Sequence, residues 1–214
     1  MIVARWLAAL CLACAVPAGF TQSTSAAAPN TPEAAPGLPL PGAGGVAALD
    51  TDAGGAPVVV TLHPNEIGLD NHAGSNVARA EFYGNQHRSI DLDGATSPQS
   101  LRTSPQALFV CLPQDNPEMR RAEATIIRMK VVKDRRVAIT FSNNVFGGSR
   151  KRIVDVIPAD KTDVPNSCWL KMTPASPLPP GEYGFVFLMK DPSFFPELIY
   201  DFSVAAPEEI KAGK

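Results

Sequence analysis

Short runs in which apolar and polar residues alternate fill residues 57–204, and Gly, Pro, Asn or Asp separate one run from the next. This period-two pattern is typical of β-strands that bury one face, and the regular turns between them indicate antiparallel pairing. No stretch of helical length carries an apolar stripe at the roughly 3.6-residue period of a helix. The sequence therefore predicts an all-β, antiparallel two-sheet (immunoglobulin-like) sandwich of about nine or ten strands, with a partly open barrel as the alternative.

The clearest alternation predicts a hairpin from residues 124–132 and 136–141, joined by a turn at residues 133–135. Side chains two positions apart on a strand share a face. The face expected in the core carries Ile127, Met129, Val131, Val137, Ile139 and Phe141, while Arg128 and Lys130 are expected to be exposed. Further strands are predicted at residues 58–62, 77–83, 88–92, 108–112, 153–157, 168–172, 183–189 and 198–204, and a turn at residues 113–117.

The N-terminus has the three-part layout of a secretory signal peptide, which we assign to residues 1–26. Arg5 precedes an apolar run, residues 6–16, that is well short of the roughly 20 residues a membrane-spanning helix needs. The expected location is periplasmic or secreted, without a transmembrane segment. The alternative is a membrane-anchored lipoprotein acylated at Cys14.

Composition divides the rest of the chain into three parts. Residues 27–56 are rich in Ala, Pro and Gly and hold few large apolar side chains, so we expect a disordered linker there. Residues 57–204 have the length of one ordinary domain. Residues 205–214 form a polar tail.

Four cysteines are present, and two of them, Cys11 and Cys14, fall in the predicted signal peptide. The remaining pair, Cys111 and Cys168, lies in strand-like runs. In an oxidising compartment such a pair forms a disulfide more often than two thiols. We predict that disulfide, with two buried thiols as the alternative.

Charge gives a weak indication of a partner. The net charge of −2 provides no bulk attraction to nucleic acid. Basic residues nevertheless gather in the middle of the chain, and the candidates for partner binding are Arg128, Lys130, Arg135, Arg136, Arg150, Lys151 and Arg152. They suggest an envelope protein or an acidic glycan as partner. The alternative is a set of solvated turns.

No catalytic motif, metal site or cofactor motif is found in the sequence. His63, His72 and His87 fall within one short window, but no two of them have the spacing that places ligands side by side on a strand or helix. No Gly-x-Ser-x-Gly motif is present. We therefore predict no catalytic residue and no cofactor.

The C-terminal part carries a resemblance. The sequence Leu178-Pro179-Pro180-Gly181-Glu182-Tyr183, followed by an apolar strand and Tyr200-Asp201-Phe202-Ser203-Val204, resembles the closing hairpin of exported bacterial β-sandwich proteins of unknown function. The resemblance implies a fold class more than an activity. In this hairpin the Tyr183 hydroxyl is expected to bind a loop carbonyl.

These observations favour an exported, non-enzymatic β-sandwich protein of the bacterial cell envelope that acts through protein or glycan contacts. The alternative is a small periplasmic enzyme or metal-binding protein that uses His63, His72 and His87.

Overall fold

The computed structural model describes residues 31–42, 44–65, 67–70, 85–113, 115–144, 151–192, 194–196 and 198–206. Across these residues the strands form three five-stranded sheets and a small two-stranded hairpin, with one short helix. The prediction of an all-β sandwich is confirmed, but three sheets are stacked where two were expected.

We name the sheets by their place. The disulfide sheet consists of β14 (Ala159–Asp163), β15 (Trp169–Pro174), β8 (Ala107–Cys111), β3 (Val46–Thr51) and β4 (Pro57–Leu62), in that order. The central sheet consists of β13 (Asp155–Ile157), β9 (Ala124–Arg128), β16 (Gly181–Phe187), β17 (Tyr200–Val204) and β7 (Ser100–Leu101). The distal sheet consists of β10 (Lys130–Val132), β11 (Arg135–Asn144), β6 (Asn85–Asp93) and β5 (Gly68–Asp70), with β12 (Lys151–Ile153) also paired to β11.

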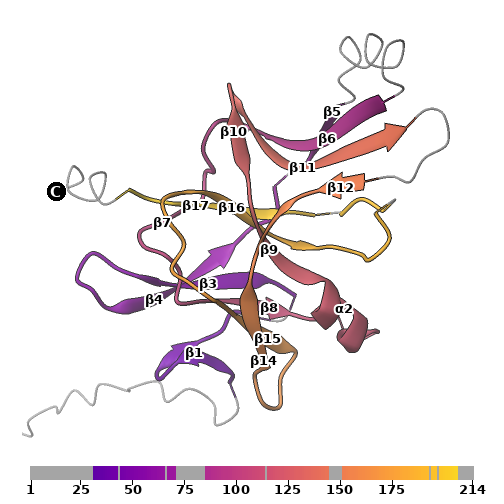
Figure 1. Cartoon of the computed structure of the whole chain (residues 1–214). Coiled ribbons are helices and arrows are strands. Elements are labelled where there is room, and N and C mark those ends of the chain that lie inside the picture. The colour runs from indigo at the N-terminus through magenta and orange to yellow at the C-terminus, as the bar shows by residue number, and fades with distance from the viewer. Residues whose placement is uncertain are drawn as a thin grey trace, which may run out of the picture.

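The central sheet is buried on both faces. In Figure 1 the distal sheet lies above it and the disulfide sheet below it. Ile126 belongs to the core shared with the disulfide sheet, whereas its neighbour Ile127 belongs to the core shared with the distal sheet. Two successive buried isoleucines are thus explained, because successive side chains of a strand point to opposite faces.

The β9–β10 segment changes sheets at Met129, and the β12–β13 segment does so at Val154. The predicted hairpin is therefore confirmed only in part: Lys130–Val132 pairs with β11, but β9 pairs with β16 and β13. The prediction that Val131 is core was wrong, because past Met129 the chain leaves the central sheet and forms the edge strand β10 of the distal sheet, where Val131 is 46% exposed.

A register shift in β11 explains the other departure from the predicted alternation. The pairing of β11 with β6 is irregular between Val137 and Ile139, as in a β-bulge. Ala138 and Ile139 are consequently both buried, and Val137 is only half-buried. Ile127, Met129, Ile139 and Phe141 are buried as predicted. Arg128 and Lys130 are exposed as predicted.

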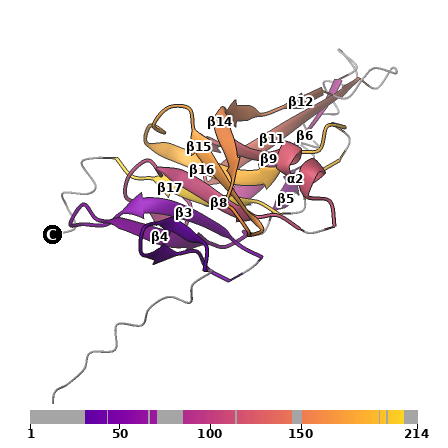
Figure 2. The ribbon, with the colours of Figure 1, turned by 90° about the horizontal axis from the view of Figure 1, so that it is seen from below.

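The linker prediction was wrong for much of residues 27–56. β3 lies between β8 and β4 in the disulfide sheet, and its Ala47 and Ala48 are fully buried. The hairpin of β1 (Glu33–Ala35) and β2 (Leu38–Pro39) precedes it, and Leu40 packs with residues of the outer face of the same sheet. Ala-rich composition suggested disorder, but small side chains suit a strand enclosed between β1–β2 on one side and the central sheet on the other. Figure 2 shows this end of the fold from below, with β3 and β4 side by side.

The helix α2 (Pro117–Glu123) was not predicted; a turn at residues 113–117 was expected before it. Asn116 caps its N-terminus by accepting a hydrogen bond from the Met119 amide at 3.3 Å, and Pro117 occupies the first turn. The remaining predicted strands have counterparts in β4, β6, β8, β12, β13, β15, β16 and β17. The predicted strand at residues 77–83, the signal peptide and most of the tail lie outside the described residues.

Candidate binding pocket beside the disulfide

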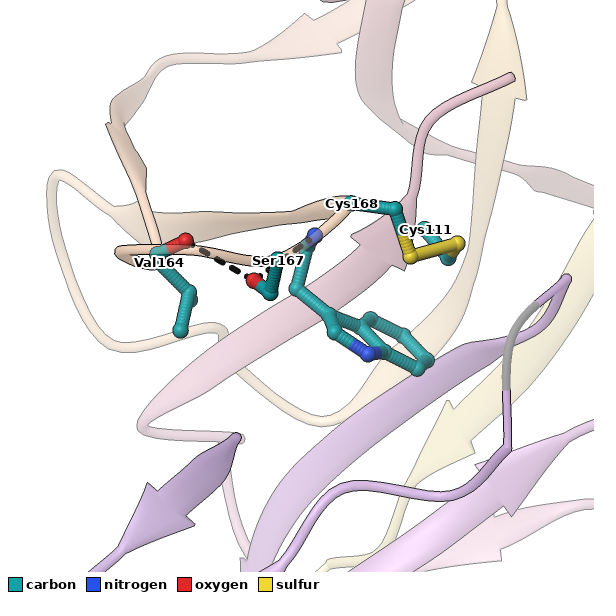
Figure 3. Close-up of a disulfide and its surroundings, with 5 residues drawn as sticks. Cys111, Val164, Ser167 and Cys168 are labelled. Atoms are coloured by element: carbon teal, nitrogen blue, oxygen red, sulfur yellow. Dashed lines mark hydrogen bonds between the residues drawn. A yellow bond between two sulfur atoms is a disulfide. The ribbon is translucent and has the colours of Figure 1, made fainter. Parts of the chain in front are cut away.

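The predicted disulfide between Cys111 and Cys168 is confirmed. Cys111 ends β8 and Cys168 directly precedes β15, and their Cα atoms lie 4.8 Å apart. Ser167 fixes the adjoining loop, because its hydroxyl donates to the Val164 carbonyl at 2.8 Å and accepts from the Trp169 amide at 3.2 Å (Figure 3). The disulfide thus joins a strand end to a loop with a defined conformation.

A cavity of about 520 Å³ opens beside this disulfide. Its walls come from the start of β3, the end of β8, α2, and the segment between β16 and β17. The residues that line it are Gly44, Gly45, Val46, Val110, Cys111, Leu112, Pro113, Arg120, Cys168, Phe187, Met189, Pro196, Leu198 and Tyr200. The volume lies within the roughly 300–1,000 Å³ of small-molecule sites, and apolar walls with few polar groups are typical of them.

Of the residues that the structure describes, two with polar side chains, Arg120 and Tyr200, line this pocket. Arg120 of α2 stands over the Phe187 ring, with its guanidinium carbon 5.4 Å from the ring centroid. Tyr200 begins β17, and burial raises the pKa of its phenol, so the hydroxyl stays protonated at neutral pH and can donate a hydrogen bond. The site therefore offers one cation and one neutral donor within an apolar wall.

The predicted basic residues are not gathered on one face. Arg136 is 0% exposed, so its assignment to partner binding was wrong. It reaches from β11 toward the central sheet, where it donates to Asp201 at 2.9 Å and to the Gly94 carbonyl at 3.1 Å. The Arg136 guanidinium is enclosed between the distal and central sheets, and its counter-ion, Asp201, lies on β17 of the central sheet.

Two of the other six basic candidates are paired within the fold. Arg135 pairs with Asp91 at 3.3 Å, and Arg152 donates to the Met189 carbonyl at 2.8 Å. Arg128 and Lys130 do lie together, lining an open hollow of about 500 Å³ between the central and distal sheets. Lys151 is exposed, and Arg150 lies outside the described residues.

The C-terminal motif that resembles exported β-sandwich proteins supplies both carboxylates that approach Arg136. Glu182 and Asp201 both approach Arg136, Glu182 at 3.9 Å from its Nε atom. Tyr183 points to the opposite face, and its hydroxyl donates to the Pro179 carbonyl at 2.7 Å, as expected. In this chain the motif joins the central sheet to the distal sheet on one face and to the disulfide sheet on the other.

Burial raises the pKa of Glu182 above its ordinary value of 4.5, although the Ser97 amide and Arg136 act against that rise. Between the ordinary and the raised pKa the folded state binds a proton that the unfolded state has lost, so this group's contribution to stability falls as pH rises through that window. We expect Glu182→Gln to remove this fall, since its amide oxygen can still accept from Ser97. Denaturant unfolding across a pH series measures it, with exposed Glu118→Gln as control. Identical pH slopes in wild type and Glu182→Gln would contradict the assignment.

The two histidines that the structure describes are associated with different sheets. His63 follows β4 and is exposed, while His87 lies in β6 of the distal sheet. His72 lies outside the described residues. Within the described part of the chain, no cluster of three or more His, Cys, Asp or Glu side chains is placed to hold a metal ion.

No protein-family model, curated protein or solved structure matches this chain. In the ranges that the structure covers, no helix has the length and apolar character needed to cross a membrane. The geometry of the chain itself is therefore the basis on which we propose a function.

Sequence reasoning missed the pocket. Gly44 and Gly45 fall in the segment predicted to be a linker, and Arg120 lies on the helix that was not predicted. One signal was present: Asn116-Pro117-Glu118 is a typical helix start, with a capping residue, a proline in the first turn and an acidic residue after it.

Proposed function

We propose that this chain is an exported, non-enzymatic binding protein of the bacterial cell envelope, and that the pocket beside the Cys111–Cys168 disulfide holds a small apolar or amphipathic molecule. The observation that carries the proposal is the pocket itself, with a volume of about 520 Å³ and predominantly apolar walls. The signal-like N-terminus and the disulfide support export, because disulfides persist in oxidising compartments.

The chemistry of the pocket supports binding rather than catalysis. Its two cysteine sulfur atoms are joined in the disulfide and are not free nucleophiles. Among the residues that the structure describes, its lining includes no histidine and no carboxylate to act as a general base. Leu198 is a large apolar side chain that stays half-exposed at the pocket, and a bound apolar molecule would cover it.

Filling the pocket should abolish binding. A Cβ atom added at Gly45 meets no atom within 4 Å, and the backbone there is not in a conformation that requires glycine. We expect Gly45→Phe to occupy the cavity and weaken the binding of N-phenyl-1-naphthylamine, a neutral apolar fluorophore, by at least about tenfold. The measurement is a fluorescence titration of the purified mature protein.

Gly42→Phe is the matched control. Gly42 also has open space around it, but it does not line the pocket. This variant should bind the fluorophore like the wild type. Absence of binding to the wild type, or equal binding by Gly45→Phe, would overturn the proposal.

A further inference from the structure

Within the described part of the chain, Arg120 is the single charged residue among those that line the pocket. Its side chain is 28% exposed and stands over the Phe187 ring, which holds the guanidinium against the apolar wall. A cation in such surroundings attracts an anion more strongly than it would in open water, because the local dielectric is lower.

Some N–H donors of the Arg120 guanidinium have no hydrogen-bond acceptor in the part of the chain that the structure describes. Within that part, the carboxylate oxygen paired with the guanidinium is Oε2 of Glu123, which lies 3.5 Å from Nη1; this is longer than the roughly 2.7–2.9 Å of a strong charge-assisted hydrogen bond. Among the described residues, none accepts a hydrogen bond from the buried Nε atom. The Nε atom is too buried for a ligand to reach, but the two Nη atoms carry four further N–H donors, so Arg120 can bind an additional acceptor that enters the pocket.

Glu123 limits the charge of that acceptor. Its side chain is only 8% exposed, and it lies on the same short helix as Arg120. A dianionic group on Arg120 would stand close to this carboxylate and be repelled by it. A single negative charge balances the guanidinium with less repulsion.

Resting on the function proposed above, we infer that the ligand class of the pocket is a monoanionic amphiphile, such as a long-chain carboxylate. Its carboxylate binds the Arg120 guanidinium, and its hydrocarbon chain lies along the apolar wall that includes Val46, Leu112 and Leu198. Arginine suits this role because its planar fork can hold both oxygens of a carboxylate.

The test compares dodecanoate with dodecan-1-ol, which has the same chain and no charge. We expect Arg120→Gln to bind dodecanoate about 10- to 100-fold more weakly than the wild type, the range expected for a hydrogen-bonded charge. Its affinity for dodecan-1-ol should be unchanged. Displacement of N-phenyl-1-naphthylamine from the mature protein measures both affinities.

Arg121→Gln is the matched control for the loss of one positive charge. Arg121 is the next residue of α2, but it pairs with Asp163, donates to the Lys161 carbonyl and does not line the pocket. This variant should bind both amphiphiles like the wild type. Arg120→Lys keeps the charge without the fork and should bind dodecanoate with intermediate affinity, which also provides a readout if Arg120→Gln does not fold.

The outcomes separate this inference from the proposed function. If the wild type binds dodecan-1-ol but Arg120→Gln binds dodecanoate as well as the wild type does, the anion assignment is overturned and the pocket remains a binding site. Tighter binding of dodecyl phosphate than of dodecanoate would overturn the preference for a single charge. If neither amphiphile binds the wild type, the proposed function fails.

Discussion

Arg136→Met is expected to lower the free energy of unfolding by about 3–5 kcal/mol, the range for removing one partner of a buried ion pair. The guanidinium is fully buried and is the cation that both Asp201 and Glu182 approach. Its loss leaves two enclosed carboxylates without a counter-ion, and an unpaired buried charge costs far more than the pair contributes. Urea denaturation at neutral pH measures the change.

Arg135→Met is the control on the neighbouring residue of the same strand. Arg135 pairs with Asp91, but its side chain is 46% exposed, so solvent screens the pair. We expect a loss of less than about 1 kcal/mol. Similar losses in the two variants would contradict the assignment of Arg136 as the buried link between the central and distal sheets.

Ile127→Ala should lower the free energy of unfolding by about 2–5 kcal/mol. Ile127 is fully buried in the core between the central and distal sheets, so truncation leaves a cavity there. Val131→Ala, four residues later in the same alternating run, should change it by less than about 0.5 kcal/mol, because Val131 is exposed. Thermal and urea unfolding of both variants measure the contrast. Equal losses would contradict the passage of the chain at Met129 from the buried central sheet to the exposed edge of the distal sheet.

Alternation in the sequence identified most strands but not the sheets to which they belong. It predicted β8, β15 and β16, each of which stays within a single sheet. It could not show that β9 and β10 belong to different sheets, because the change at Met129 preserves the alternation of side chains. The adjacent Ile126 and Ile127 were the available sign of a strand buried on both faces.

Composition misled the prediction at β3. Ala47 and Ala48 contribute little apolar volume, so the segment appeared unable to form a core. In the fold both alanines are fully buried, and larger side chains of other strands fill the cores on the two faces of β3. Composition indicates how much apolar surface a segment can bury by itself. It does not show how much apolar surface the neighbouring strands contribute to the same core.

The pocket could not be predicted from sequence because distant segments build it. Gly45, Leu112, Arg120 and Leu198 come from four parts of the chain, and no local pattern relates them. The basic residues predicted a binding surface in another part of the fold, yet Arg136, the most buried of them, forms an ion pair inside the protein. Only the pairing of the strands shows that Arg120 lies in the apolar wall of the pocket, where it is the one cation among the described lining residues.

The central claim is that the cavity beside the disulfide is a ligand site, and methyl NMR of the mature protein tests it most directly. Leucine and valine methyl groups are observed while dodecan-1-ol is added. We expect saturable shifts at Val46, Val110, Leu112 and Leu198, which line the pocket. Shifts confined to the exposed Val131, Val132 and Val156, or no saturable shifts at all, would contradict it.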